Sequence, residues 1–483
     1  MKDVIEQIHP LDSPPCDRLA VFLFTPSFAQ WATRSDTFLQ SAIDRLYKNQ
    51  AYCTIAALAA VVDKLPVPCS IPAPQDQHGL EGFEGVSYSF LANTGQRIEA
   101  PESRISENGS LSFHHKAQPA VTGELLEDDY ARSNIIRVPL ANTVFQTGRP
   151  VTLFSSSWSK DKPSDTPSCK TWTQLSNHTL EIRNQSDDST TQTVSSMSIP
   201  LIPLTFPRKI EAGMGNIVRR IIGSDQKSMT ASTELENVVP RYFKARGQSP
   251  QAISVWALVT PETIVDSVSR ITASVLNGEA SEGWEFSNEA WATLWKTGKP
   301  IPENLVDSAI AKGARLHRVL SGGGGWGKKA GLLALDPDIS YDESFSSPAV
   351  EDNTDRFSAM DTWGVVHEFV RPGEFVQFFT LHPDPAKFAN TLSRKANWEF
   401  GTISSTMDSI PTSSSQAVSP GTSSVAIYPN YFGALTESAL TIVERRTLDS
   451  EKAEAWEVVN ATKIDVPHTR FCTAELVGRN NQS

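Results

Sequence analysis

The sequence predicts a mixed fold, α/β to α+β, with two α/β units followed by a β-rich C-terminal portion. Two apolar runs, Leu19 to Phe24 and Ile253 to Val259, have the length and composition of buried strands, and each is followed closely by Thr-Pro and a helical pattern. The last third of the chain alternates short apolar runs with turn residues, as successive strands do. A length of 483 residues fits two or three domains.

The first unit follows an N-terminal arm, residues 1–18, and is expected to span 19–154. After the strand at Leu19 to Phe24, apolar residues at helical spacing from Phe38 to Leu46 predict an amphipathic helix. Thr54 to Val62 predicts a second strand. A strand, a helix and a strand in this order favour a parallel pair with a right-handed crossover. Further strand-like segments lie at 82–91 and 135–153.

Two polar segments are expected to be flexible. Residues 155–195 are dense in Ser, Thr, Asp, Asn and Lys, so we predict a flexible insertion and a domain boundary there. Residues 403–424 are rich in Ser, Thr and Pro and form a second such segment. It lies within the β-rich C-terminal portion, residues 341–483, whose clearest feature is a hairpin with its turn at Arg371 to Glu374.

The second α/β unit is expected over residues 196–340. Gly213-Met214-Gly215 weakly resembles a dinucleotide turn, although Asn216 as an ordinary helix N-cap is the preferred interpretation. Thr233-x-x-Glu236 is a capping box that predicts a helix to about residue 245. Apolar spacing from Leu305 to Leu320 predicts another helix, which would end at the glycine run that follows.

The glycine run is Ser321-Gly-Gly-Gly-Gly-Trp-Gly-Lys-Lys329, and it fits most of the Walker A pattern from Gly322 to Lys328. Lys329 replaces the hydroxyl residue that holds magnesium, and the predicted helix stands where a strand should precede the loop. Three interpretations stay open: a helix C′ cap at Gly322 with a tight connection, an anion-binding loop, and a working P-loop.

Charge gives the anion-binding interpretation its support. No acidic residue occurs from Ala309 to Leu335, whereas the chain as a whole carries a net charge of −12. A basic island in an acidic protein attracts phosphates, carboxylates or an acidic partner surface. The predicted ligand-binding residues are Gly322, Gly323, Gly324, Gly325, Gly327, Lys328, Lys329, Arg315 and Arg318.

Composition narrows the classes of function. The acidic balance argues against broad nucleic-acid binding. The five cysteines form no CxxC pair, which favours a reducing compartment with free thiols. No secretory signal and no apolar run of transmembrane length occurs. We therefore expect a cytoplasmic protein without a membrane span, with the mitochondrial matrix as the alternative.

No catalytic motif is evident. Neither a Gly-x-Ser-x-Gly elbow nor a His-Glu-x-x-His helix occurs, and no metal site is predicted. The adjacent pair His114-His115 has no third ligand nearby, so it is expected at the surface or in a core. The sequence indicates no particular cofactor.

One resemblance concerns the stretch from Leu316 to Asp336, which contains the glycine run and Gly331-Leu-Leu-Ala-Leu-Asp336. This stretch resembles a signature found in a family of uncharacterised fungal proteins. The resemblance covers about twenty residues of this sequence and implies no activity.

Two functions are consistent with these observations. The first is a non-enzymatic binding or assembly protein whose basic, glycine-rich loop engages a phosphate-bearing ligand or an acidic partner. The second is an enzyme acting on a phosphorylated or nucleotide substrate at the same loop. In that case Lys328 would stabilise negative charge on phosphate oxygens, and the general base is not identified.

Overall fold

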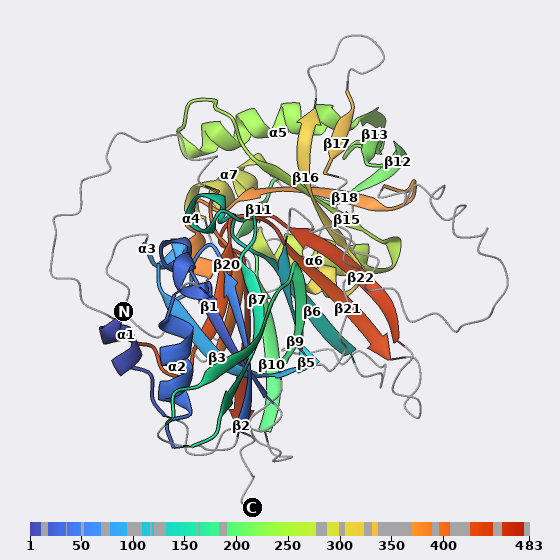
Figure 1. Ribbon diagram of the computed structural model, residues 1–483. Helices are drawn as coiled ribbons and strands as arrows, with labels where there is room; N and C mark the ends of the chain where they lie inside the picture. Colours follow the sequence, from blue (N-terminus) through green and yellow to red (C-terminus); the bar gives the residue numbers. More distant parts are fainter. Residues whose placement is uncertain are drawn as a thin grey trace, which may run out of the picture. The chain divides into compact units, whose positions relative to one another are not determined.

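A computed structural model describes residues 1–10, 18–34, 36–49, 53–68, 78–93, 109–115, 118–119, 132–162, 165–182, 191–276, 287–298, 305–322, 331–336, 370–388, 396–405, 426–447 and 456–477 (Figure 1). The chain forms two compact units. Unit 1 comprises Met1–Ser196, Asn390–Leu440 and Pro467–Ser483, and unit 2 comprises Met197–Ala389 and Thr441–Val466. The predicted C-terminal portion, 341–483, is therefore divided between the two units.

Unit 1 contains short helices and most of the strands. Its helices are α1 (Lys2–Glu6), η1 (Pro26–Ala32), α2 (Phe38–Leu46), α3 (His78–Glu81) and α4 (Val144–Thr147). Its strands are β1 (Arg18–Phe24), β2 (Cys53–Val61), β3 (Val86–Asn93), β4 (Ser110–His115), β5 (Gln118–Pro119), β6 (Arg132–Pro139), β7 (Leu153–Lys160), β8 (Ser168–Gln174), β9 (Asn177–Ile182), β10 (Thr191–Ser198), β19 (Trp398–Thr402), β20 (Phe432–Thr436) and β23 (Arg470–Val477).

Unit 2 contains the longer helices. They are α5 (Ala231–Arg246), η2 (Glu262–Ile264), α6 (Val265–Val275), α7 (Asn288–Thr297), α8 (Leu305–Ala311) and η6 (Pro385–Phe388). Its strands are β11 (Leu201–Pro203), β12 (Arg208–Met214), β13 (Ile217–Ile222), β14 (Ser228–Thr230), β15 (Val255–Thr260), β16 (Arg315–Gly322), β17 (Leu333–Leu335), β18 (Phe375–Leu381), β21 (Leu440–Thr447) and β22 (Trp456–Ile464).

The strand–helix–strand unit predicted at the start of unit 1 is confirmed. β1 pairs with β2 in parallel, and α2 lies between them in the chain. β3 borders β1 on its other edge in antiparallel pairing. The apolar run Leu19 to Phe24 is almost completely buried because both faces of this central strand are covered. The apolar side of α2, from Phe38 to Leu46, packs into the same core.

Two sheets face each other in unit 1. Within this unit the first sheet has the order β6-β4-β9-β3-β1-β2-β7-β8, and the second has the order β20-β19-β23-β10-β5. The ring of Phe113 on β4 lies 4.3 Å from that of Phe400 on β19 and 6.5 Å from that of Phe432 on β20. These aromatic contacts fill the space between the sheets.

The expected flexible insertion at 155–195 is wrong, because this segment contributes strands β7 to β10. Along β7, buried residues such as Trp158 alternate with half-buried serines. Hydroxyl pairs join β7 to β8, Ser157 with Thr171 at 2.6 Å and Ser159 with Ser168 at 3.0 Å. Cross-strand pairs of this kind stabilise a sheet although the side chains are polar, and composition alone conceals them.

Unit 2 is built on a six-stranded antiparallel barrel. The strands follow the order β12-β13-β17-β16-β15-β18, and β18 closes the barrel by pairing with β12. β11 and β14 extend β18 and β13. The predicted mixture of helices and strands is confirmed, but the chain is richer in strands than expected and the sequence did not indicate the barrel.

The helix predicted from Leu305 to Leu320 is present over its first part and wrong over its second. Helix α8 ends at Ala311, Gly313 adopts a positive φ of 98°, and Arg315 to Gly322 form strand β16. Leu316 lies opposite Leu258 of β15, and Gly322 lies opposite Leu333 of β17. Gly322 is therefore a strand residue and not a helix C′ cap. The local apolar spacing is that of a helix, but pairing with β15 and β17 stabilises a strand instead.

The predicted N-cap at Asn216 is also wrong. Gly215, with a φ of 59°, and Asn216 form the turn of the β12–β13 hairpin, and the Asn216 amide donates to the carbonyl of Leu335 at 2.6 Å. Helix α5 exists as predicted, although it begins at Ala231 with Thr230 as its N-cap. The hairpin turn requires a residue with positive φ, which explains why Gly215 is a glycine.

Three further expectations concern the C-terminal third. Strand β18 and its preceding turn at Gly373 (φ 96°) are present, whereas the predicted partner strand before the turn falls largely at 361–369, outside the described residues. Most of the polar segment 403–424 is also outside them. The apolar residues from Val425 to Tyr428 also predict a strand, but none is formed at 426–428, where the backbone is irregular.

Candidate functional site

The glycine run connects two strands of a hairpin. The chain leaves β16 at Gly322 and enters antiparallel β17 shortly after Gly331 (Figure 1). A Walker A loop connects a strand to a helix, so the P-loop interpretation is excluded by the local fold. Of the predicted ligand-binding residues, Arg315, Arg318 and Gly322 lie on β16. The others, Gly323, Gly324, Gly325, Gly327, Lys328 and Lys329, fall outside the described residues.

A shallow hollow lies beside β16 in unit 2, with a volume of about 290 Å³ counted out to the solvent. The space enclosed within it is only about 10 Å³, which is about the room that one water molecule needs, so a phosphoryl or carboxyl group could bind only at its mouth. It is lined by Arg315, Leu316, His317, Arg318, Asp336, Ala461, Thr462, Lys463 and Asp465. The lining therefore brings together the basic strand β16, the end of β17 and strand β22.

Arg315 has a structural partner. One guanidinium nitrogen donates to both carboxylate oxygens of Glu374, each at 2.8 Å, and the two side chains are 19% and 13% exposed. Glu374 also accepts from the backbone N–H of Arg371 at 3.1 Å. This largely buried pair fixes β16 to the turn before β18. The predicted role of Arg315 in binding a ligand would require this pair to break.

Arg318 is held more loosely. Its guanidinium lies 3.9 Å from the Asp465 carboxylate, and its side chain is 38% exposed. The other oxygen of Asp465 accepts from the indole N–H of Trp256 at 2.7 Å, so the carboxylate is positioned by β15. Nearby, Lys463 pairs with Asp336 at 3.1 Å. The Arg318 guanidinium also donates to the Ser254 hydroxyl at 3.5 Å, so an anion at Arg318 would compete with both Asp465 and Ser254.

Burial changes the ionisation of the groups in the hollow. It lowers the pKa of His317 to about 4, despite the hydrogen bond between its Nδ1 and the Asp336 carbonyl, so the imidazole is neutral at pH 7. Burial also raises the pKa of Asp465, opposed by the Trp256 hydrogen bond and the positive charges of Arg318 and Lys463. At neutral pH, Arg315, Arg318 and Lys463 supply the positive charge.

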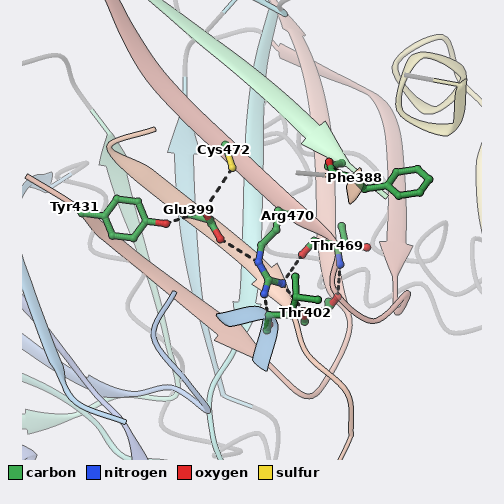
Figure 2. A network of polar contacts seen from close by, with 9 residues as sticks. Phe388, Glu399, Thr402, Tyr431, Thr469, Arg470 and Cys472 are labelled. Carbon is green, nitrogen blue, oxygen red and sulfur yellow. Dashed lines mark hydrogen bonds and ion pairs between the residues drawn. The ribbon is translucent and has the colours of Figure 1, made fainter. Parts of the chain in front are cut away.

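A second polar cluster lies in unit 1, at residues that the sequence did not single out (Figure 2). Glu399 on β19 pairs with Arg470 on β23 at 3.0 Å, and their side chains are only 3% and 10% exposed. Tyr431 donates to Glu399 at 2.7 Å, and the Cys472 thiol lies 3.8 Å from the same oxygen. Burial raises the pKa of Glu399, and Arg470 opposes this most strongly.

The remaining donors of Arg470 are also occupied. Its guanidinium donates to the carbonyls of Thr402 at 2.6 Å, Thr469 at 3.0 Å and Leu80. A buried charge pair whose donors are satisfied by the chain itself is a structural element. The sequence carried one indication of it, an isolated Glu and an isolated Arg within two apolar strands.

His468 adjoins this cluster without forming a catalytic relay. Its Nε2 lies 3.4 Å from the Ser404 hydroxyl and 3.6 Å from the Glu81 carboxylate. In a serine–histidine–acid triad the serine and the acid contact opposite ring nitrogens. Here both contact the same nitrogen, so this geometry does not activate Ser404.

The histidine pair on β4 is part of the fold. His115 is 1% exposed, and its pKa is lowered to about 4 by burial and by the charge of His114. Within the described ranges, no group of three or more His, Cys, Asp or Glu residues is arranged to hold a metal ion. No helix of the described chain is long and apolar enough to cross a bilayer.

Comparisons with protein-family models, with curated proteins and with solved structures find no match. The resemblance of Leu316 to Asp336 to a fungal family therefore stays a prediction, and function must be argued from the site alone.

Proposed function

We propose that this chain is a non-enzymatic binding or assembly protein that engages a phosphate-bearing ligand or an acidic partner surface at the β16–β17 hairpin. One observation supports this most directly: β16 leads from the hollow that contains Arg318 to the glycine run that contains Lys328 and Lys329. Gly322 lies four positions after Arg318, or about 13 Å along a strand.

The chemistry of the hairpin suits an anion. Glycine backbones allow N–H groups to approach phosphate oxygens closely, and lysines add positive charge. Arg318 offers a planar guanidinium that can donate two parallel hydrogen bonds to a phosphate or carboxylate. Its contact with Asp465, at 3.9 Å, is long for an ion pair. An anion at Arg318 would compete with Asp465 and Ser254 and leave the Arg315–Glu374 pair intact.

The enzyme alternative requires a general base near Lys328. His317, Asp336 and Asp465 line the same hollow. However, a histidine with a pKa of about 4 is a weak base, and both carboxylates already contact positive side chains. We therefore place the enzyme, acting on a phosphorylated or nucleotide substrate, second.

Thermal unfolding in the presence of inorganic phosphate, nucleotides, sugar phosphates and coenzyme A tests the proposal. A ligand that binds the native state at 100 times its Kd stabilises it by about 2.7 kcal/mol. We expect at least one phosphate compound to raise the Tm of the wild type, and the Arg318→Ala and Lys328→Ala/Lys329→Ala variants to lose most of this shift.

Arg270→Ala is the matched control, because Arg270 is an exposed arginine of α6 in the same unit. It should keep the full shift. Absence of a shift with every compound, or a shift that all variants retain, would contradict phosphate binding at this hairpin. Turnover of a phosphate ester that Lys328→Ala abolishes would favour the enzyme instead.

A further inference from the structure

Unit 2 exposes two large apolar side chains among its described residues, and both lie at one end of the barrel. Met214 is 76% exposed and Leu320 is 56% exposed. Met214 is the last residue of β12 and lies opposite Ile217 of β13. Ile217 in turn lies opposite Ala334 of β17, and Ala334 lies opposite Ser321 of β16. This row of partners crosses four neighbouring strands, and Leu320 directly precedes Ser321.

The same barrel end has more positive than negative charge. In the β12–β13 hairpin, residues 212–223 contain Arg219 and Arg220 and no acidic residue, although Glu211 of β12 directly precedes them. The β16–β17 hairpin lies in the acid-free stretch 309–335. Arg219 is exposed, and Arg220, which pairs with Glu211 at 3.1 Å, has an exposed side chain as well. Glu211 is the one acidic residue in the sequence of these two neighbouring hairpins, so they are a local departure from a net charge of −12.

Exposed apolar side chains flanked by cations match one kind of surface best. A free phosphate compound offers nothing for Met214 and Leu320 to contact, and an acidic protein surface is rich in hydrated carboxylates. A bilayer with anionic lipids presents headgroup phosphates above an apolar layer. Arginines bind the phosphates while methionine and leucine side chains enter the boundary between headgroups and acyl chains.

We propose that this end of the barrel docks on membranes that contain anionic phospholipids, with Met214 and Leu320 entering the bilayer surface and Arg219 and Arg318 binding lipid phosphates. The inference rests on the proposed anion-binding function and names the ligand as a lipid headgroup in a membrane. Binding is peripheral and reversible, because two apolar side chains and a few cations provide a weak anchor.

Co-sedimentation of the full chain with phosphatidylcholine vesicles, with and without phosphatidylserine, tests this. We expect the wild type to bind only when phosphatidylserine is present. Met214→Ser/Leu320→Ser should lower partitioning about tenfold through the lost apolar burial. Arg219→Ala should lower it about fivefold, since each arginine near an anionic surface contributes about that factor.

Two matched controls isolate the site. Phe145→Ser removes an apolar side chain that is 98% exposed in unit 1, and Lys227→Ala removes a cation whose side chain is 82% exposed, near the other end of β13. Both should leave vesicle binding unchanged. Equal losses in the controls and in the site variants would overturn the proposal, because exposure or net charge alone would then explain binding.

Failure of this inference is distinguishable from failure of the proposed function. If phosphate compounds raise the Tm through Arg318 but vesicles are not bound, the anion site stands and the membrane proposal is overturned. If soluble polyglutamate binds as tightly as phosphatidylserine vesicles and Met214→Ser/Leu320→Ser has no effect, an acidic protein partner replaces the membrane. If neither phosphate nor vesicles bind, both proposals are overturned.

Discussion

In each unit, burial keeps a strand histidine neutral at pH 7. His115 on β4 is 1% exposed and His317 on β16 is 5% exposed. Desolvation lowers the pKa of each to about 4, below the ordinary value of 6.5. As pH falls below 6.5 the unfolded chain therefore takes up the protons first. The free energy of unfolding therefore has its full value above about pH 6.5, where these histidines are neutral in both states, and decreases as pH falls toward 4.

We therefore expect the protein to be acid-labile between pH 6.5 and 4, with each histidine accounting for a loss of up to about 3 kcal/mol. His317→Gln and His115→Gln should each reduce the difference in free energy of unfolding between pH 7 and pH 4.5, measured in urea. His9→Gln, at an exposed position, should leave that difference unchanged. A pH dependence identical in all four proteins would contradict the assignment.

At the scale of elements, predictions succeeded where local pattern and tertiary packing agree. The β1–α2–β2 unit, helix α5 and strand β15 follow from apolar runs and helical spacing. The predictions failed where pairing between strands that are distant in the sequence determines the local structure. Leu316 and Leu320 have helical spacing, yet β15 and β17 hold them in a strand. The serines of β7 suggest flexibility, yet β8 pairs with them.

The candidate site shows the same limit. Charge patterning identified Arg315, Arg318 and the glycine run, because a basic island is visible within a short stretch of sequence. It did not identify Lys463 or Asp465, which reach the hollow only because β22 folds near β16. It also did not identify Trp256 of β15, whose indole N–H holds Asp465. It also did not distinguish Arg315, held by Glu374, from the loosely held Arg318.

The Glu399–Arg470 pair ties β23 to β19 across a buried interface, so its removal should destabilise both strands. Arg470→Met leaves the Glu399 carboxylate buried without its main partner, and we expect a loss of about 3–5 kcal/mol in the free energy of unfolding. Tyr431→Phe removes one hydrogen bond to a charged group and should cost less, about 1.5–3 kcal/mol. Urea unfolding of the full chain measures both.

Adding Glu399→Leu to Arg470→Met provides the control for this prediction. If the cost comes from an unpaired buried charge, replacing that charge with an apolar side chain should recover most of the lost stability. A double variant no more stable than Arg470→Met would instead show that the arginine acts mainly through its bonds to the carbonyls of Thr402, Thr469 and Leu80.

At the scale of the whole molecule, the chain passes from unit 1 to unit 2 and back more than once. Its charge is distributed unevenly as well. Residues 309–335 carry five lysines and arginines without an acidic residue, while the whole sequence has a net charge of −12. An anionic membrane therefore attracts the barrel end at short range and repels the molecule as a whole at long range.

Salt should separate these two effects. The Debye length is about 30 Å at 0.01 M ionic strength, about 8 Å at 0.15 M and about 3 Å at 1 M. At the lowest salt the repulsion of the whole acidic molecule reaches the membrane, and at the highest the local attraction is screened too. We therefore expect binding to phosphatidylserine vesicles to be strongest at an ionic strength of about 0.1–0.15 M, where the Debye length is about 8–10 Å. Binding should be weaker at both extremes. In Arg219→Ala the maximum should be lower at the same salt concentration. A steady decrease from 0.01 M upward would show that the net charge has no influence and that only the contacting residues matter.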